Sequence, residues 1–124
     1  GTPSASAASG FAIQVAGASI NKTGLIFYGI TDVNAQAAAW GTTSYLCVKA
    51  PTQRMPAANS SNVNSAPCTG SHDVDWNAFM AAHTGALGSP RYAGQSFDAQ
   101  YWFRYPPAVK ATNLSRSLRF CLAP

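Results

Sequence analysis

The last quarter of the chain alternates between large apolar and polar side chains. In residues 97–104, one face of an extended strand would carry Phe97, Ala99, Tyr101 and Phe103, and the other would carry Asp98, Gln100, Trp102 and Arg104. A period of two residues is typical of a β-strand with one face on a core. Residues 118–122 repeat the pattern after two prolines, which end the first strand because proline donates no ladder hydrogen bond. The sequence therefore predicts a terminal β-hairpin.

Three earlier segments also predict strands. Residues 11–16 alternate, residues 25–30 are apolar on both faces as in a central strand, and residues 43–49 precede Pro51. We expect the first two to pair as a hairpin across a turn at residues 21–24. Residues 32–41 are expected to form a loop or a short helical turn.

The middle of the chain is poorer in large apolar residues. Residues 51–67 are rich in Pro, Asn, Ser and Ala, which indicates a long surface loop with at most one edge strand. In residues 71–83, we expect a strand through Asn77 followed by a helical turn behind an Asp cap.

Together these elements predict an all-β fold. Short strands separated by Gly, Pro and Asn turns are typical of an antiparallel β-sandwich, here with long loops and at most one short helical turn. A chain of 124 residues suits one domain. We assign residues 11–124 to that domain, and residues 1–10 to a small-residue N-terminal tract or linker.

The composition indicates a protein of the cell exterior. Charged residues make up only 10% of the chain, against about 25% in an average soluble domain. The N-terminal tract, interpreted as a signal-cleavage product or a linker, points the same way. The net charge of +4 comes from scarce acids and scattered bases, so we predict no nucleic-acid partner. No apolar run approaches the roughly 18 residues of a membrane span.

The three cysteines fit neither a structural zinc site, which needs four ligands at metal-binding spacing, nor a full disulfide framework. The simplest interpretation is one disulfide and one spare thiol. Cys47–Cys68 is the preferred pair, because Cys68 closes the loop that follows the strand containing Cys47. A Cys47–Cys121 bridge is the alternative, and a leftover thiol would be able to pair between chains.

The sequence offers no specific catalytic or metal motif. His72 and His83 are candidate general bases, but no nucleophile elbow accompanies them. Asp73, Asp75 and Asn77 alternate like the opening of a calcium loop, yet the sixth and twelfth positions hold Ala78 and Thr84 instead of Gly and Glu. We therefore expect an Asp cap there. We predict a non-enzymatic protein without a metal or cofactor.

Aromatic residues are numerous for a small domain. Exposed rings with nearby amides and carboxylates suit stacking on sugar rings. The candidates for such stacking are Trp102, Trp76, Trp40 and Tyr105. The alternative interpretation is that Trp102, on the polar face of its strand, covers a neighbouring strand or lies in a protein interface.

Several segments together resemble a known group of modules. They are residues 46–54, residues 75–78, the strand at residues 94–104, and residues 113–120. These resemble uncharacterised modules at the C-terminal end of large secreted or surface bacterial proteins, and the resemblance covers roughly residues 24–124. The group tends to have Arg-Asp-Pro after the aromatic strand, whereas Tyr105 stands at the Asp position here. The resemblance implies a surface module and supplies no catalytic residue.

Two functions follow as hypotheses. A small-residue tract such as residues 1–10 is mobile unless something holds it. We expect a neighbouring subunit to do so, either by accepting the segment onto an open sheet edge or by packing against it. The first hypothesis is therefore a self-assembling extracellular subunit, with Phe11, Ile13 and Val15 as contacts and other copies of the chain as partners. The alternative is a secreted carbohydrate-binding module that recognises cell-surface glycans.

Overall fold

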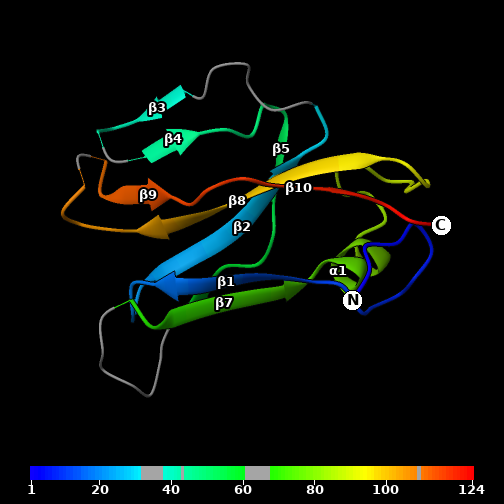
Figure 1. Cartoon of the computed structure of the whole chain (residues 1–124), viewed down its shortest axis with the longest axis horizontal. Helices are drawn as coiled ribbons and strands as arrows, with labels where there is room; N and C mark the ends of the chain where they lie inside the picture. The colour runs from blue at the N-terminus through cyan, green and yellow to red at the C-terminus, as the bar shows by residue number, and fades with distance from the viewer. Residues whose placement is uncertain (32–37, 43, 61–67, 109) are drawn as a thin grey trace.

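The computed structural model describes residues 1–31, 38–42, 44–60, 68–108 and 110–124 (Figure 1). Its elements, in chain order, are β1 (Ala12–Ala18), β2 (Thr23–Gly29), β3 (Ala38–Trp40), β4 (Ser44–Leu46), β5 (Thr52–Arg54), β6 (Ala58–Asn59), β7 (Gly70–Asp75), α1 (Trp76–Ala82), β8 (Ser96–Arg104), β9 (Thr112–Leu114) and β10 (Leu118–Cys121). The named strands pair antiparallel, and one short helix interrupts them. The predicted all-β, sandwich-like fold is confirmed.

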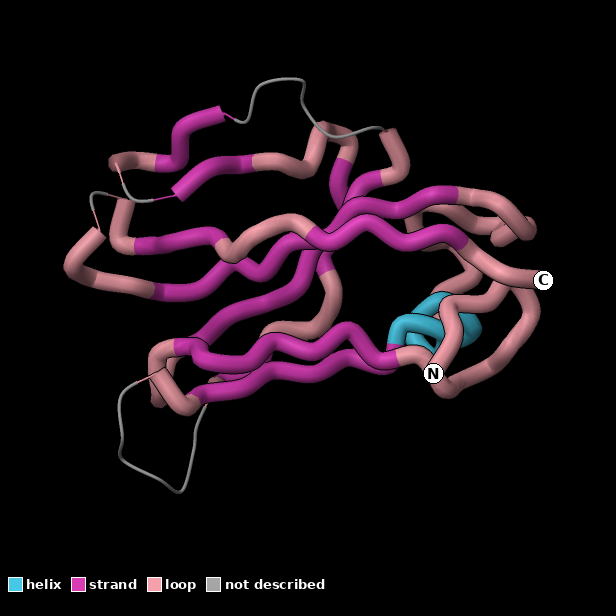
Figure 2. Tube along the Cα trace, in the orientation of Figure 1, coloured by secondary structure: helices cyan, strands magenta, loops and turns pink. Residues whose placement is uncertain are grey.

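A six-stranded sheet forms the centre of the molecule (Figure 2). Its main order is β10-β8-β2-β5, with β6 also paired to β2 and β9 also paired to β8. In the β8–β10 pair, Phe120 lies opposite Phe97. The predicted terminal pairing of residues 97–104 with residues 118–122 is confirmed, and β9 adds a second, shorter pairing with β8.

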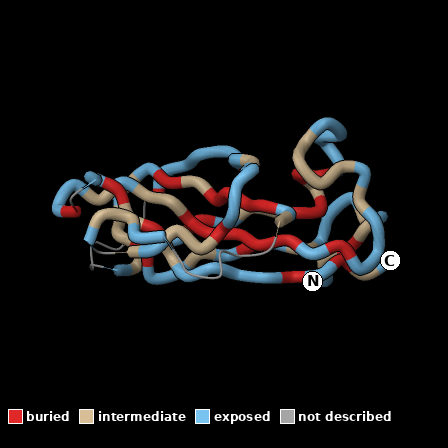
Figure 3. Tube along the Cα trace, turned by 90° about the horizontal axis from the view of Figure 1, so that it is seen from above, coloured by how far each residue is buried: buried red, intermediate tan, exposed pale blue. Residues whose placement is uncertain are grey.

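Both faces of the central sheet are covered. The β1–β7 pair and α1 pack on one face, and the β3–β4 hairpin lies on the other (Figure 1). The alternation along β8 explains this arrangement, since Phe97, Ala99 and Tyr101 enter the larger core while Trp102 enters the smaller one. Seen from above, buried residues run through the interior of the layers (Figure 3).

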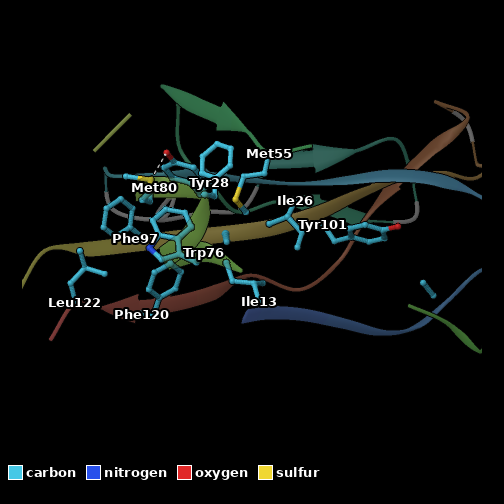
Figure 4. Close-up of a cluster of buried hydrophobic side chains, with 13 residues drawn as sticks. Ile13, Ile26, Tyr28, Met55, Trp76, Met80, Phe97, Tyr101, Phe120 and Leu122 are labelled. Carbon is cyan, nitrogen blue, oxygen red and sulfur yellow. Dashed lines mark hydrogen bonds between the residues drawn. The ribbon is translucent and has the colours of Figure 1, made fainter. Parts of the chain in front are cut away.

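The larger core contains a cluster of aromatic rings that pack edge to face (Figure 4). The Trp76 ring lies 4.5 Å from the Tyr28 ring and 4.7 Å from the Phe97 ring, both nearly edge-on. The Tyr28 hydroxyl donates to the Leu87 carbonyl at 2.7 Å, so the one polar atom of that ring is satisfied. Edge-to-face contacts of this kind add about 0.5–1.5 kcal/mol each beyond the burial of area.

The predicted pairing of residues 11–16 with residues 25–30 is wrong. β1 pairs with β7, with Ile13 opposite Val74. The physical reason is that both edges of β2 are occupied, by β8 on one side and by β5 and β6 on the other. β1 therefore packs across the sheet as part of a second layer.

Several predicted boundaries also change. Residues 38–40 form strand β3 instead of a loop or helical turn, and the strand expected over residues 43–49 ends at Leu46. Residues 51–60 contain two short strands, β5 and β6, where at most one was expected, and residues 61–67 lie outside the described residues. The helix begins at Trp76, one residue after its Asp75 cap.

The N-terminal tract is held by its own chain. The Asn77 side chain accepts a hydrogen bond from the Ser4 amide at 3.1 Å and donates to the carbonyls of Thr2 and Ser9. Arg91 donates to the carbonyls of Ser4 and Ala7. The expectation that a neighbouring subunit must hold residues 1–10 is therefore not needed to explain their order.

Candidate functional site

A pocket of about 230 Å³ lies between the central sheet and the β3–β4 hairpin. Its walls are largely aliphatic and aromatic, with one hydroxyl and one guanidinium among them. The lining residues are Leu25, Phe27, Trp40, Leu46, Val48, Ala50, Thr52, Arg54, Trp102 and Leu114. They come from β2, β3, β4, β5, β8, β9 and the β4–β5 connection, so the tertiary fold creates the pocket.

Gln100 fixes the wall that follows β4. Its side-chain oxygen accepts from the amides of Cys47 and Val48, at 2.9 and 3.2 Å. Its side-chain nitrogen donates to the carbonyls of Tyr45 and Ser115, at 3.0 and 2.7 Å. This buried amide is fully satisfied, as buried polar groups generally are, and it replaces a backbone ladder between β4 and the sheet.

Two further side-chain bonds tie the hairpin to β9. The Trp40 indole nitrogen donates to the Thr112 hydroxyl at 3.0 Å, and the Ser44 hydroxyl donates to the Asn113 side-chain oxygen at 2.8 Å. The Leu114 amide in turn donates to the Ser44 hydroxyl at 3.1 Å. These bonds hold the Trp40 ring at the pocket.

The fold brings together two of the four predicted stacking residues. Trp40 and Trp102 both line the pocket, and both are partly exposed. Trp76 does not contribute, because its side chain is completely buried in the larger core. Tyr105 lies outside the pocket lining and packs edge-on against Phe103, with ring centroids 6.4 Å apart. The prediction for Trp76 is therefore wrong.

Two cations border the aromatic surface. Arg54 lines the pocket from β5, and the Lys110 ammonium lies 4.4 Å from the centroid of the Trp40 ring. A cation over an indole face is attracted by the ring quadrupole, by about 0.5–1 kcal/mol at an exposed site. Neither residue follows a recognisable pattern in the sequence, because only the fold brings Arg54 to the pocket and Lys110 to the Trp40 ring.

The predicted metal candidates do not converge. The Asp75 carboxylate accepts from the amides of Gly10 and Ala78, at 2.8 and 2.9 Å, and these bonds lower its pKa. Asn77 is buried against the N-terminal tract, whereas Asp73 is exposed on β7. Within the described residues, no group of three or more His, Cys, Asp or Glu side chains is suited to a metal ion. The predicted Asp cap is confirmed.

The predicted disulfide is absent, since Cys47, Cys68 and Cys121 are all free thiols. Cys47 follows β4 and Cys68 precedes β7, on opposite sides of the central sheet (Figure 1). The alternative partner, Cys121, lies beside Ser96, whereas the Cys47 amide is bound to Gln100. Four residues of strand, about 13 Å, separate those two β8 positions. A disulfide requires Cα atoms within about 7 Å.

The two candidate general bases, His72 and His83, lie outside the pocket and contact structural elements of the fold. The His83 ring nitrogen lies 2.8 Å from the Phe79 carbonyl at the end of α1. His72 is buried beside Tyr101, with ring centroids 5.3 Å apart, and burial lowers its pKa. The pocket lining contains neither histidine.

Comparison with protein families, characterised proteins and solved structures finds no match to this chain. The site is therefore interpreted from its own chemistry. In the described part of the chain, no helix is long and apolar enough to cross a membrane.

Proposed function

We propose that this chain is a non-enzymatic binding module of the cell exterior. Its site is the pocket between the β3–β4 hairpin and the central sheet, and its ligand is a sugar ring of a glycan. The observation that carries the proposal is the meeting of Trp40 and Trp102, which lie far apart in the sequence, at one partly exposed apolar pocket. Indole faces bind the apolar face of a ring, while hydroxyl groups turned to the open side keep their water.

The dimensions of the pocket favour a small unit. Pockets for drug-sized ligands generally measure about 300–1,000 Å³, and this one measures about 230 Å³. It therefore suits one ring at a time. The side chains that fix its walls, Gln100, Ser44 and Thr112, are engaged in hydrogen bonds and so present a preformed surface.

The test is a binding screen against immobilised glycans, followed by titration of tryptophan fluorescence. We expect Trp102→Ala to weaken binding of any positive glycan by about 5-fold or more, because loss of a ring stacked on an aromatic side chain, as for nucleic-acid bases, costs about 1–3 kcal/mol. Tyr92→Ala is the matched control, since Tyr92 is 63% exposed and lies outside the pocket lining. Equal affinities for the wild type and Trp102→Ala would contradict the proposal.

Self-assembly is the second candidate function, and a different observation supports it. Leu118 on the edge strand β10 is 44% exposed, and it borders a groove of about 80 Å³ together with Ile13 and Val15 of β1. An edge strand beside an apolar groove is a template for strand addition. Ile13 itself is buried in the core of its own chain and Phe11 packs on Phe120, so contact between copies would centre on Val15 and Leu118.

Light scattering tests this second candidate. An assembled particle that Leu118→Lys reduces to a monomer of about 13 kDa would support it. A wild-type monomer across the accessible concentration range would exclude it.

A further inference from the structure

Arg54 lines the pocket from a defined strand register. In the β2–β5 pair, Arg54 lies opposite Phe27, whose ring lines the same pocket. Thr52, two residues earlier on β5, shares that face, whereas Gln53 faces the other way and accepts from the Leu87 amide. Alternation along a strand therefore fixes the Arg54 side chain on the pocket side.

No carboxylate in the described part of the chain neutralises this charge. Asp98 pairs with Arg119 at 2.8 Å, Asp75 caps α1, and Asp73 belongs to β7 in the layer on the opposite face of the central sheet. Among the described residues, the pocket lining contains no acid. Arg54 has five donors in a planar fork that matches a carboxylate. Any carboxylate that pairs with it comes from outside the described residues.

Lys110 places a second positive charge next to the pocket, although it is not a lining residue. Its ammonium lies over the Trp40 ring, which the hydrogen bond to Thr112 holds at the pocket. The pocket thus combines an apolar wall, two indole rings and one cationic residue, Arg54, and Lys110 lies beside Trp40 outside the lining. A neutral sugar would contact the apolar wall and the indole rings but would form no ion pair with the cations.

We propose that the ligand of this pocket is an acidic sugar, in which a uronic acid ring lies on the Trp40–Trp102 surface and its carboxylate pairs with Arg54. This inference rests on the proposed glycan-binding function and narrows its ligand class. Lys110 supplies long-range attraction to the same negative charge. Because both cations are exposed, salt screens the attraction, with a Debye length of about 10 Å at 0.1 M ionic strength.

The experiment compares matched ligands by fluorescence titration of the whole chain. The acidic probes are uronic acid trisaccharides built from galacturonate, glucuronate or mannuronate, and each is paired with its fully methyl-esterified form. The two forms share their rings and differ in charge. We expect at least one acid form to bind about 3- to 5-fold more tightly than its ester, and the difference to shrink at 1 M NaCl.

Variants then assign the charge to Arg54. We expect Arg54→Gln to weaken binding of the acid about 3- to 10-fold and to weaken binding of the ester by a clearly smaller factor. Arg54→Lys should restore part of the loss. Arg116→Gln, which removes the same charge from an exposed site outside this pocket, is the control and should have less than a 2-fold effect. Circular dichroism confirms that each variant is folded.

The possible outcomes distinguish failure of the acidic-sugar proposal from failure of the glycan-binding proposal. Equal binding of acids and esters, lost in Trp102→Ala, would overturn the acidic ligand and leave glycan binding standing. Arg54-dependent binding of 2-naphthoate without binding of any uronate would assign the charge to an aromatic carboxylate and overturn the sugar. Binding of none of the probes, together with a negative glycan screen, would overturn both proposals.

Discussion

His72 and Tyr101 each bury a polar side-chain atom that would be better hydrogen-bonded. Both side chains are buried, and neither the His72 Nε2 atom nor the Tyr101 hydroxyl has a hydrogen-bond partner in the described part of the chain. A buried polar atom without a partner generally costs about 1–3 kcal/mol. The pair is therefore a point of low stability between β7 and β8.

We predict that this pair makes stability depend on pH. Burial lowers the pKa of His72 from 6.5 in spite of the opposing charge of Asp73. Below about pH 6.5 the unfolded chain binds a proton that the folded chain resists, so stability falls as the pH decreases. Urea unfolding at pH 7.5 and pH 5.0 measures the effect. His72→Leu should lose less stability between the two pH values than the wild type, and an identical loss in both would contradict the prediction.

The Tyr101 side chain also leaves no room for a side chain at position 24, which is occupied by glycine. A Cβ atom at this position would collide with the Tyr101 hydroxyl and would lie 2.7 Å from the Trp102 carbonyl oxygen, which belongs to a paired strand and cannot move freely. We predict that Gly24→Ala lowers the free energy of unfolding by about 1–3 kcal/mol, the usual cost of overpacking. Gly85→Ala, where a Cβ meets nothing within 4 Å, should change it by less than about 0.5 kcal/mol in the same urea titration.

At the scale of elements, one side chain holds the β3–β4 hairpin over the sheet. Replacing Gln100 with Ala would leave two amides and two carbonyls without their present partners. We predict a loss of about 2–4 kcal/mol in the free energy of unfolding, because several polar groups lose partners at once. Hydrogen exchange should show the Cys47 and Val48 amides losing protection first.

Gln14→Ala is the matched control for this variant, since Gln14 is exposed on β1. It should change the free energy of unfolding by less than about 0.5 kcal/mol. Similar losses in Gln100→Ala and Gln14→Ala would show that Gln100 does not hold the hairpin.

The sequence predicted elements best where alternation was long. β8 and β10 were found because their large apolar residues recur at every second position. β3 was missed because Ala38 and Ala39 have little strand preference, and its pairing depends on β4. The pocket residues differ in the same way. Trp40 and Trp102 are candidates from the sequence because they are aromatic, whereas only the β2–β5 register brings Arg54 to the pocket lining.

At the scale of the whole molecule, residues 1–10 act as part of the fold. We predict that a chain lacking them loses about 1–3 kcal/mol of stability, because the Asn77 side chain, 1% exposed, loses its partners Thr2, Ser4 and Ser9. Thermal unfolding measures the change. Ser6→Ala, at an exposed position in the same tract, is the control and should be neutral. Unchanged stability after the deletion would contradict this account.

Layer arrangement was the part of the fold that periodicity did not predict. Residues 11–16 and 25–30 have the patterns of two strands, but alternation does not specify which strands pair. The β2 edges are taken by strands distant in sequence, and this long-range competition moves β1 to β7. The same limit applies to the cysteines, since their pairing depends on which face of the sheet each occupies.

The bridge between Ser4 and Ala123 brings the two ends of the described chain side by side, next to α1 (Figure 1). The Ala5 amide donates to the Ala123 carbonyl at 2.8 Å, and the Ala123 amide donates to the Pro3 carbonyl at 2.9 Å. A short peptide linker would therefore suffice to join the ends and allow the chain to be reopened at a surface turn. Such a circular permutant, cut between β1 and β2, would keep the pocket intact.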